Sequence, residues 1–118
     1  MSYDIDLEDP ITRSPIKLDA PHQMKGGTYA IGGTTDASLN ITYNYATHYY
    51  KIFGEKGIRT IYEMTGAESI PVLTKAINLL GNDVSDDYWE ATEGNAKMAL
   101  IQLRALAQMR PDGIWNGD

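Results

Sequence analysis

Cysteine is absent from this sequence of 118 residues, and no stretch of apolar residues is long. The lack of cysteine excludes disulfides, thiolate metal sites and a cysteine nucleophile. A helix that crosses a membrane needs roughly 20 consecutive apolar residues, and no run comes near that length. No charged and then apolar leader opens the sequence, so we expect a cytoplasmic protein with no membrane partner.

Positive charge is scarce as well, since ten Lys and Arg stand against sixteen Asp and Glu, which gives a net charge of −6. Proteins that bind nucleic acids directly need a basic face, and we therefore expect no such binding. The acidic residues gather on Asp4, Asp6 and Glu8 and within residues 83–93. They form solvated faces on one interpretation, and on another a surface that engages a basic groove of a partner.

Histidine occurs only twice, as His22 and His48. The spacing of the histidines and carboxylates matches no HExxH-like motif, and we predict neither a metal site nor a cofactor. No serine lies in a nucleophile-elbow pattern, and no carboxylate has an identifiable catalytic partner. We therefore predict no catalytic residue, while a histidine acting as a base stays open as an alternative.

The first half of the sequence predicts strands. Residues 3–7 alternate apolar with acidic side chains, and residues 15–19 are expected to return as the second strand of a hairpin. Two further strands are predicted at residues 28–31 and at about 37–43. Together these segments favour a small, mostly antiparallel sheet with one solvated face.

The second half predicts three to four helices. Asn44, Thr65 and Thr92 are the expected N-caps, and Thr65 with Glu68 matches a capping box. The helical segments are expected at residues 44–53, 57–64, 66–80 and 93–109. The third should turn Ile70, Leu73, Ile77 and Leu80 inward, and the fourth Ala96, Ala99, Leu100, Leu103 and Leu106. Ile114 and Trp115 are expected to pack back onto the sheet. Strands first and helices second are typical of an α+β fold, here as one domain over residues 1–118.

A Gly-Gly-Thr sequence occurs twice, six residues apart, and is the most unusual local feature. Glycines let a backbone approach a ligand closely, and successive amides can hold an anion. The stretch lacks the Gly-Lys-Ser/Thr ending of a P-loop, and two tight turns around a strand explain it equally. The candidate ligand-binding residues of this region are Lys25, Gly26, Gly27, Thr28, Gly33 and Thr34.

Tyrosine is strongly favoured over phenylalanine, at eight residues against one. A tyrosine buries area and keeps a polar tip, so it suits partner contacts and stacking on a base. Tyr43 and Tyr49 are expected to fill the core. Tyr45 and Tyr50 point in different directions, so at least one should be exposed. Tyr45 and Tyr50, together with His48, complete the predicted ligand-binding set.

Several stretches resemble a group of uncharacterised small proteins encoded by prophages and other mobile elements of bacteria. The similar segments are 40–44 (NITYN), 66–73 (GAESIPVL) with Ala76, 94–97 (GNAK) and 110–115 (RPDGIW), together with the Gly-Gly-Thr region. The resemblance spans most of the chain and carries over no catalytic residue. It implies a mobile-element origin, and small acidic proteins from that source are often inhibitors of host machinery.

Three functions are compatible with these observations. The first is a non-catalytic binding protein that inhibits a host anti-phage defence process, by occupying a host protein or by sequestering a small nucleotide signal. The acidic balance favours the protein partner, and the glycines, threonines and tyrosines favour the nucleotide. The second is a small hydrolase that acts on a nucleotide. The third is a structural or assembly protein of the element, in which exposed tyrosines form a homo-oligomer interface.

Overall fold

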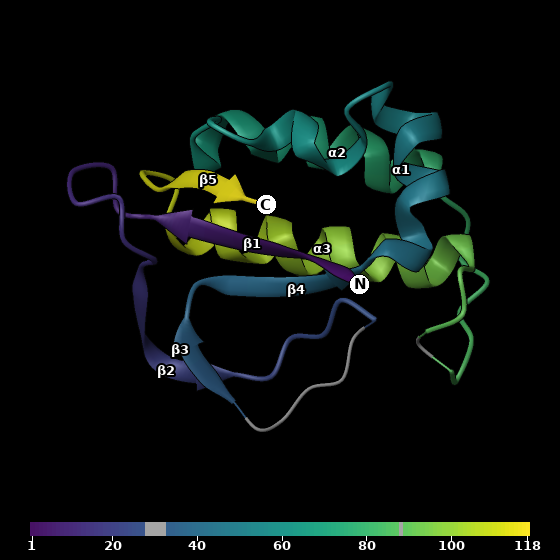
Figure 1. Ribbon diagram of the computed structural model, residues 1–118, viewed down its shortest axis with the longest axis horizontal. Helices are drawn as coiled ribbons and strands as arrows, with labels where there is room; N and C mark the ends of the chain where they lie inside the picture. Colours follow the sequence, from purple (N-terminus) through teal and green to yellow (C-terminus); the bar gives the residue numbers. More distant parts are fainter. Residues whose placement is uncertain (28–32, 88) are drawn as a thin grey trace.

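Two antiparallel sheets and three α-helices make up the computed structural model, which describes residues 1–27, 33–87 and 89–118 (Figure 1). The predicted α+β class is confirmed, with strands mostly N-terminal and helices mostly C-terminal. The predicted strand at 28–31 lies outside the described residues. The elements are, in order, β1 (Ser2–Glu8), β2 (Lys17–His22), β3 (Thr34–Asp36), β4 (Ser38–Thr42), the 3₁₀-helix η1 (Tyr43–Tyr45), α1 (Ala46–Phe53), the 3₁₀-helix η2 (Gly57–Ile61), α2 (Gly66–Leu79), α3 (Glu93–Met109) and β5 (Ile114–Gly117).

The main sheet has the strand order β4-β1-β5, so the first strand is central and the last one lies at an edge. Ile5 pairs with Leu39 of β4, and Leu7 pairs with Trp115 of β5. Figure 1 shows β1 between β5 and β4, with α3 behind the sheet. Ile114 and Trp115 return to the sheet as expected, but they do so as its edge strand β5 and not as a tail packed onto its face.

The predicted hairpin within the first twenty residues forms only next to its turn, where the N–H of Ile16 donates to the Leu7 carbonyl and the N–H of Asp9 to the Ser14 carbonyl, each at 2.9 Å. β2 pairs with β3 in a separate two-stranded sheet, and only an isolated bridge between Glu8 and Pro15 links its approach to β1. The side chains of β1 at Ile5 and Leu7 are completely buried, whereas four of the six β2 residues are exposed. The long-range partners β4 and β5 bury apolar side chains beside β1, which the polar β2 segment could not do.

One cluster of buried apolar residues joins the sheet to the helices. The predicted inner face of α3 is confirmed, because each of its members is at most 1% exposed: Ala96, Ala99, Leu100, Leu103 and Leu106. On α2, Leu73, Ile77 and Leu80 just beyond its end are buried as predicted, whereas Ile70 is only half-buried. The helices α2 and α3 pack against each other along this apolar seam.

Local capping chemistry decides where the helices begin. The capping box is confirmed at α2, since Thr65 Oγ1 accepts from the Glu68 amide at 3.1 Å and Glu68 Oε1 accepts from the Thr65 amide at 2.9 Å. Thr92 caps α3 as predicted. Asn44 is not the cap of α1, because Thr42 caps the short helix η1 that precedes it. The side chain of Asn44 instead donates from Nδ2 to the carbonyl of Trp89 at 2.9 Å.

Within the described ranges, no helix combines the length and the apolar character needed to span a bilayer.

Candidate functional site

The glycine-rich segment is held between β4 and α3. The main chain of Lys25 makes two hydrogen bonds with the side-chain amide of Gln102: its N–H donates to Oε1 at 2.7 Å, and its carbonyl accepts from Nε2. The next residue, Gly26, accepts from the amide of Thr42 at 2.8 Å and forms a parallel bridge with Ile41. Residues 25–27 are therefore an ordered wall fixed on both sides.

Glycine is required at two of these positions because other parts of the protein approach them closely. A Cβ on Gly26 would lie 2.3 Å from the carbonyl oxygen of Asn40. Gly27 has a φ of +79°, and its Cβ would lie 2.3 Å from the hydroxyl of Tyr45. Side chains other than glycine rarely adopt such a φ. The close approach allowed by these glycines is thus made first by the protein itself.

Three of the predicted residues, Lys25, Gly27 and Tyr45, line one pocket of about 280 Å³, which we call the Lys25 pocket. Its other lining residues come from the neighbouring loop segments and from α3: Gln23, Val84, Ser85, Asn95, Met98 and Gln102. Segments separated by most of the chain therefore meet at this site.

Asn95 makes the loop wall of the Lys25 pocket rigid. This side chain is only 5% exposed. Its Nδ2 donates to the carbonyls of Asp87 at 3.1 Å and Glu90 at 2.9 Å, and its Oδ1 accepts from the Ser85 amide at 3.2 Å. A buried amide with three partners fixes the loop before α3 in one position.

Lys25 supplies the only formal charge among the described residues that line the pocket.

Tyr45 is 1% exposed, and its ring meets that of Tyr49 edge-on, with centroids 6.3 Å apart. Burial, with a smaller contribution from the negative charge of Asp87, raises the pKa of Tyr45 to about 12. Its hydroxyl is therefore protonated at neutral pH. The expectation that a base could stack on Tyr45 fails, because no face of this ring is accessible.

The other predicted residues lie elsewhere. His48 lines a separate pocket of about 330 Å³ with Lys51 and Glu93, and its Nε2 lies 2.8 Å from the carbonyl of Ala91. Tyr50 is 44% exposed, as expected for one of the pair, and lies against Gly57.

The second Gly-Gly-Thr sequence does not contribute described residues to the Lys25 pocket. Gly33 lies beside the end of β2, where a Cβ would be 3.3 Å from the carbonyl of His22, and Thr34 pairs with His22 in the small sheet. Thr28 lies outside the described residues. Within the described residues, the two Gly-Gly-Thr sequences therefore do not form one continuous anion-binding loop.

Neither histidine lines the Lys25 pocket. The Nε2–H of His22 donates to the carbonyl of Asp36 at 2.7 Å, and its Nδ1 accepts from the amide of Met24 at 3.3 Å. Within the described ranges, no group of three or more His, Asp or Glu side chains is arranged to hold a metal ion.

Sequence reasoning missed Asn95, Met98 and Gln102, which all lie on α3. Each occupies a polar or rim position beside the apolar face of that helix, and such positions usually face solvent. No local signal distinguishes them, because Gln102 acts through its bonds to Lys25 and Asn95 through its bonds to the loop before α3. Comparison of the chain with protein-family models, with curated proteins and with solved structures gave no match.

Proposed function

We propose that this protein is a non-catalytic binding protein that holds a small anionic ligand, a nucleotide in the first instance, in the Lys25 pocket. One observation carries the proposal. Lys25, Gly27 and Tyr45, which the sequence predicts as ligand-binding residues, line one pocket. Hydrogen bonds of Gln102 and Asn95 hold the walls of that pocket. A preformed pocket that combines apolar area with a few polar groups is typical of ligand sites.

The chemistry of the lining suits a phosphorylated ligand with a flat apolar part. The Lys25 ammonium supplies the positive charge that a phosphate requires. Val84 and Met98, which are 62% and 48% exposed, supply apolar area at the rim. Gln23 adds a side-chain amide that has no hydrogen-bond partner within the described ranges and could read the edge of a base.

The size of the pocket restricts the ligand. About 280 Å³ lies just below the volumes of typical small-molecule sites, which start at about 300 Å³. A mononucleotide fits this volume better than a dinucleotide or a peptide.

Binding is preferred to hydrolysis because of what surrounds the pocket. Its described lining has no imidazole or carboxylate that could act as a general base. The hydrolase alternative would need His22 or His48, and these line two other pockets.

The biological role that we propose rests on the resemblance to proteins of mobile elements. On that basis the protein acts in the cytoplasm of a bacterial host and inhibits an anti-phage defence process. Sequestration of a nucleotide signal is the form of inhibition that the Lys25 pocket supports.

One observation favours a second form, in which the protein occupies a host protein. Trp89 is 46% exposed and lies beside the exposed carboxylates of Asp86, Asp87 and Glu90. An exposed tryptophan is a common anchor of protein interfaces, and the carboxylates would select a basic partner.

Calorimetry with 5′-AMP, 5′-GMP and 5′-UMP tests the ligand. We expect saturable binding of at least one of them, at least tenfold weaker binding to Lys25→Gln, and unchanged binding to the matched control Lys75→Gln on α2. The corresponding nucleoside should bind more weakly, because it lacks the phosphate. Absence of binding by all three, together with no nucleotide in native mass spectra of the purified protein, would contradict the proposal. Turnover of a bound nucleotide would overturn its non-catalytic part.

A plating assay separates the two forms of inhibition. The protein is expressed in a bacterial host that carries a nucleotide-signalled defence system, and phage plating is measured. Loss of protection of the phage with Lys25→Gln but not with Trp89→Ala supports sequestration. The opposite pattern supports the protein partner, and equal protection with both variants contradicts both forms.

A further inference from the structure

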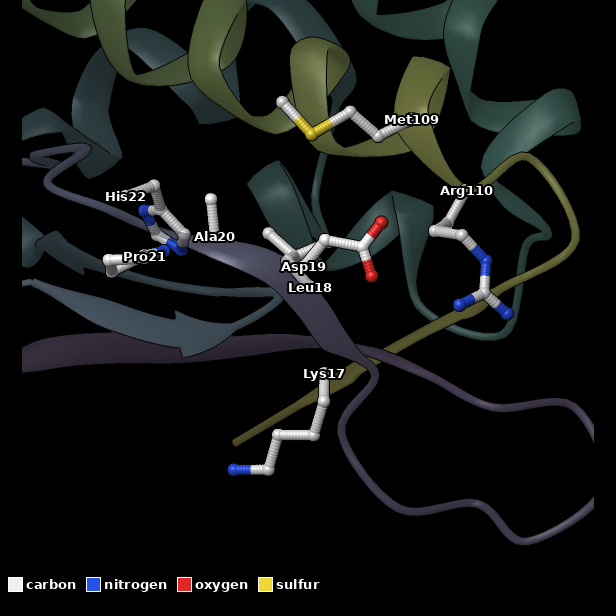
Figure 2. A pocket seen from close by; sticks show the side chains of 8 residues that line it. All are labelled: Lys17, Leu18, Asp19, Ala20, Pro21, His22, Met109 and Arg110. Atoms are coloured by element: carbon white, nitrogen blue, oxygen red, sulfur yellow. The ribbon is translucent and has the colours of Figure 1, made fainter.

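A second pocket, of about 400 Å³, lies between β2 and the C-terminal end of α3 and shares no lining residue with the Lys25 pocket (Figure 2). It was not singled out by the sequence. Leu18, Ala20, Pro21 and Met109 supply its apolar lining, and Met109 is 53% exposed. We call it the Asp19 pocket, after the carboxylate in its lining.

The two basic side chains at this pocket, Lys17 and Arg110, are each paired with a carboxylate that does not line it. The ammonium of Lys17 forms an ion pair with Asp36, and Figure 2 shows Lys17 on the opposite side of the strand from Asp19. The guanidinium of Arg110 binds both carboxylate oxygens of Asp112, with its Nε and its Nη2 each 2.9 Å from an oxygen. Such a bidentate pair holds the guanidinium firmly.

The imidazole of His22 is engaged by two backbone groups. Its Nδ1 accepts a hydrogen bond from the Met24 amide, so that nitrogen carries no proton. Its Nε2–H donates to a backbone carbonyl at 2.7 Å. Both nitrogens are therefore engaged in the neutral form of the ring.

Asp19 is the remaining charged group of this pocket. It is exposed and has no hydrogen bond or ion pair with any residue of the described ranges. Figure 2 shows its carboxylate beside Met109 and Arg110. Its effect on Arg110 is secondary, because Asp112 and Asp9 both do more than Asp19 to raise the pKa of that guanidinium. The pocket thus carries one carboxylate that no described residue engages in a hydrogen bond or an ion pair, above an apolar lining.

We propose that the Asp19 pocket binds an organic cation, namely a primary ammonium on an aliphatic stem. The ammonium pairs with the Asp19 carboxylate, and the stem lies on Leu18, Pro21 and Met109. An exposed ion pair alone contributes little. Removal of the stem from water therefore supplies most of the affinity, while the carboxylate selects the charge. The ligand is either a free alkylamine or the lysine side chain of a partner protein.

Titration followed by ¹H–¹⁵N NMR tests the site with n-butylammonium as the probe. We expect saturable shifts at the amides of residues 18–20, 22 and 109–110, and at least fivefold smaller shifts with n-butanol at equal concentration. Butyrate, which has the same stem and the opposite charge, should give no saturable shift. Equal binding of butanol, or stronger binding of butyrate, would overturn the assignment.

Variants distinguish the pocket from non-specific attraction to an acidic protein. Asp19→Asn should weaken binding of n-butylammonium at least fivefold, whereas the matched control Glu55→Gln, at an exposed position between α1 and η2, should leave it unchanged. Both carboxylates are exposed, so both variants are expected to fold, which the same spectra verify. Equal weakening by both variants would show general electrostatics and would overturn the site.

A lysine-containing peptide distinguishes the two sources of the cation. Acetyl-Ala-Lys-Ala-amide should shift the same amides if the stem and charge of lysine are sufficient. At least tenfold tighter binding than n-butylammonium assigns the pocket to a partner's lysine, and equal or weaker binding assigns it to a free amine. Either assignment also requires that Asp19→Asn weaken the binding of the ligand concerned.

Discussion

The side-chain amide of Gln102 bonds to both backbone groups of Lys25, which lies 77 residues earlier in the sequence. Its oxygen accepts from the Lys25 amide and its nitrogen donates to the Lys25 carbonyl, as a neighbouring strand would do. This one side chain ties the glycine-rich segment to α3 and sets one wall of the Lys25 pocket.

Gln102→Ala should release that wall. We expect faster hydrogen exchange at the Lys25 amide and a loss of about 1 kcal/mol in the free energy of unfolding, because two hydrogen bonds to a partly exposed group are removed. Affinity for the mononucleotide identified by calorimetry should fall as well. The control is Gln108→Ala, at an exposed position of the same helix. Exchange at Lys25 that is equal in the two variants would contradict the anchoring role.

Gly27→Ala should destabilise the protein for two separable reasons, its positive φ and the approach of Tyr45. Gly54 has a φ of +96° with nothing within 4 Å of its Cβ position, so Gly54→Ala measures the backbone term alone, about 1–3 kcal/mol. Denaturant unfolding should show a larger loss for Gly27→Ala than for Gly54→Ala. Adding Tyr45→Phe should recover part of the difference, since the hydroxyl makes the closest contact. Equal losses at the two glycines would show that the steric contact is unimportant.

The buried hydroxyl of Ser69 connects β5 to α2. It accepts from Trp115 Nε1 at 2.7 Å and donates to the carbonyl of Gly66 at 2.8 Å. Ser69→Ala should lower the free energy of unfolding by about 1–3 kcal/mol, because it leaves the indole N–H buried without a partner. In a double-mutant cycle with Trp115→Phe, the loss from Ser69→Ala should become smaller. Ser14→Ala, at an exposed loop position, is the control and should change stability by less than about 0.5 kcal/mol.

Acid should weaken the start of α2. Two hydrogen bonds with Thr65 lower the pKa of Glu68 from its ordinary value of 4.5. A lowered pKa in the folded state means that the contribution is fully present above pH 4.5 and is lost as the pH falls through the folded-state value. Hydrogen bonds likewise lower the pKa values of Asp9 and Asp112, which act in the same direction.

The urea midpoint should therefore fall between pH 6 and pH 3. Glu68→Gln keeps an acceptor for the Thr65 amide but cannot titrate, so its midpoint should fall less over the same range. NMR of the Glu68 carboxyl should give a titration midpoint below 4.5. An identical pH dependence of the wild type and Glu68→Gln would contradict this role of the capping box.

Local features were predictable wherever one short segment contains all the atoms involved. The Thr65–Glu68 box, the Thr92 cap and the apolar face of α3 depend on spacings of three and four residues, and they form as expected. Asn44 was misplaced as a cap because Thr42, two residues earlier, offers its hydroxyl to the backbone first.

Strand pairing was not predictable in the same way. The alternation in β1 shows which side chains turn inward, but not which strands lie beside it. The segment at residues 15–19 is nearest in sequence, but it pairs with β1 at one bridge only. The strands β4 and β5 pair with β1 instead, and they bring Leu39, Ile41 and Trp115 into the core. Proximity along the chain favours a hairpin only when the return strand also has an apolar face to bury.

The sequence by itself determined that no disulfide, no thiolate site and no long apolar span is possible, and that Lys25, Gly27 and Tyr45 were worth attention. Only the tertiary structure decided that these three line one pocket with Gln102, that Tyr45 has no face to offer a base, and that Asp19 remains without a partner in the described ranges. The physical reason is that the spacing of residues in a sequence reports only interactions between residues a few positions apart. Burial and charge compensation depend instead on contacts that close over most of the chain.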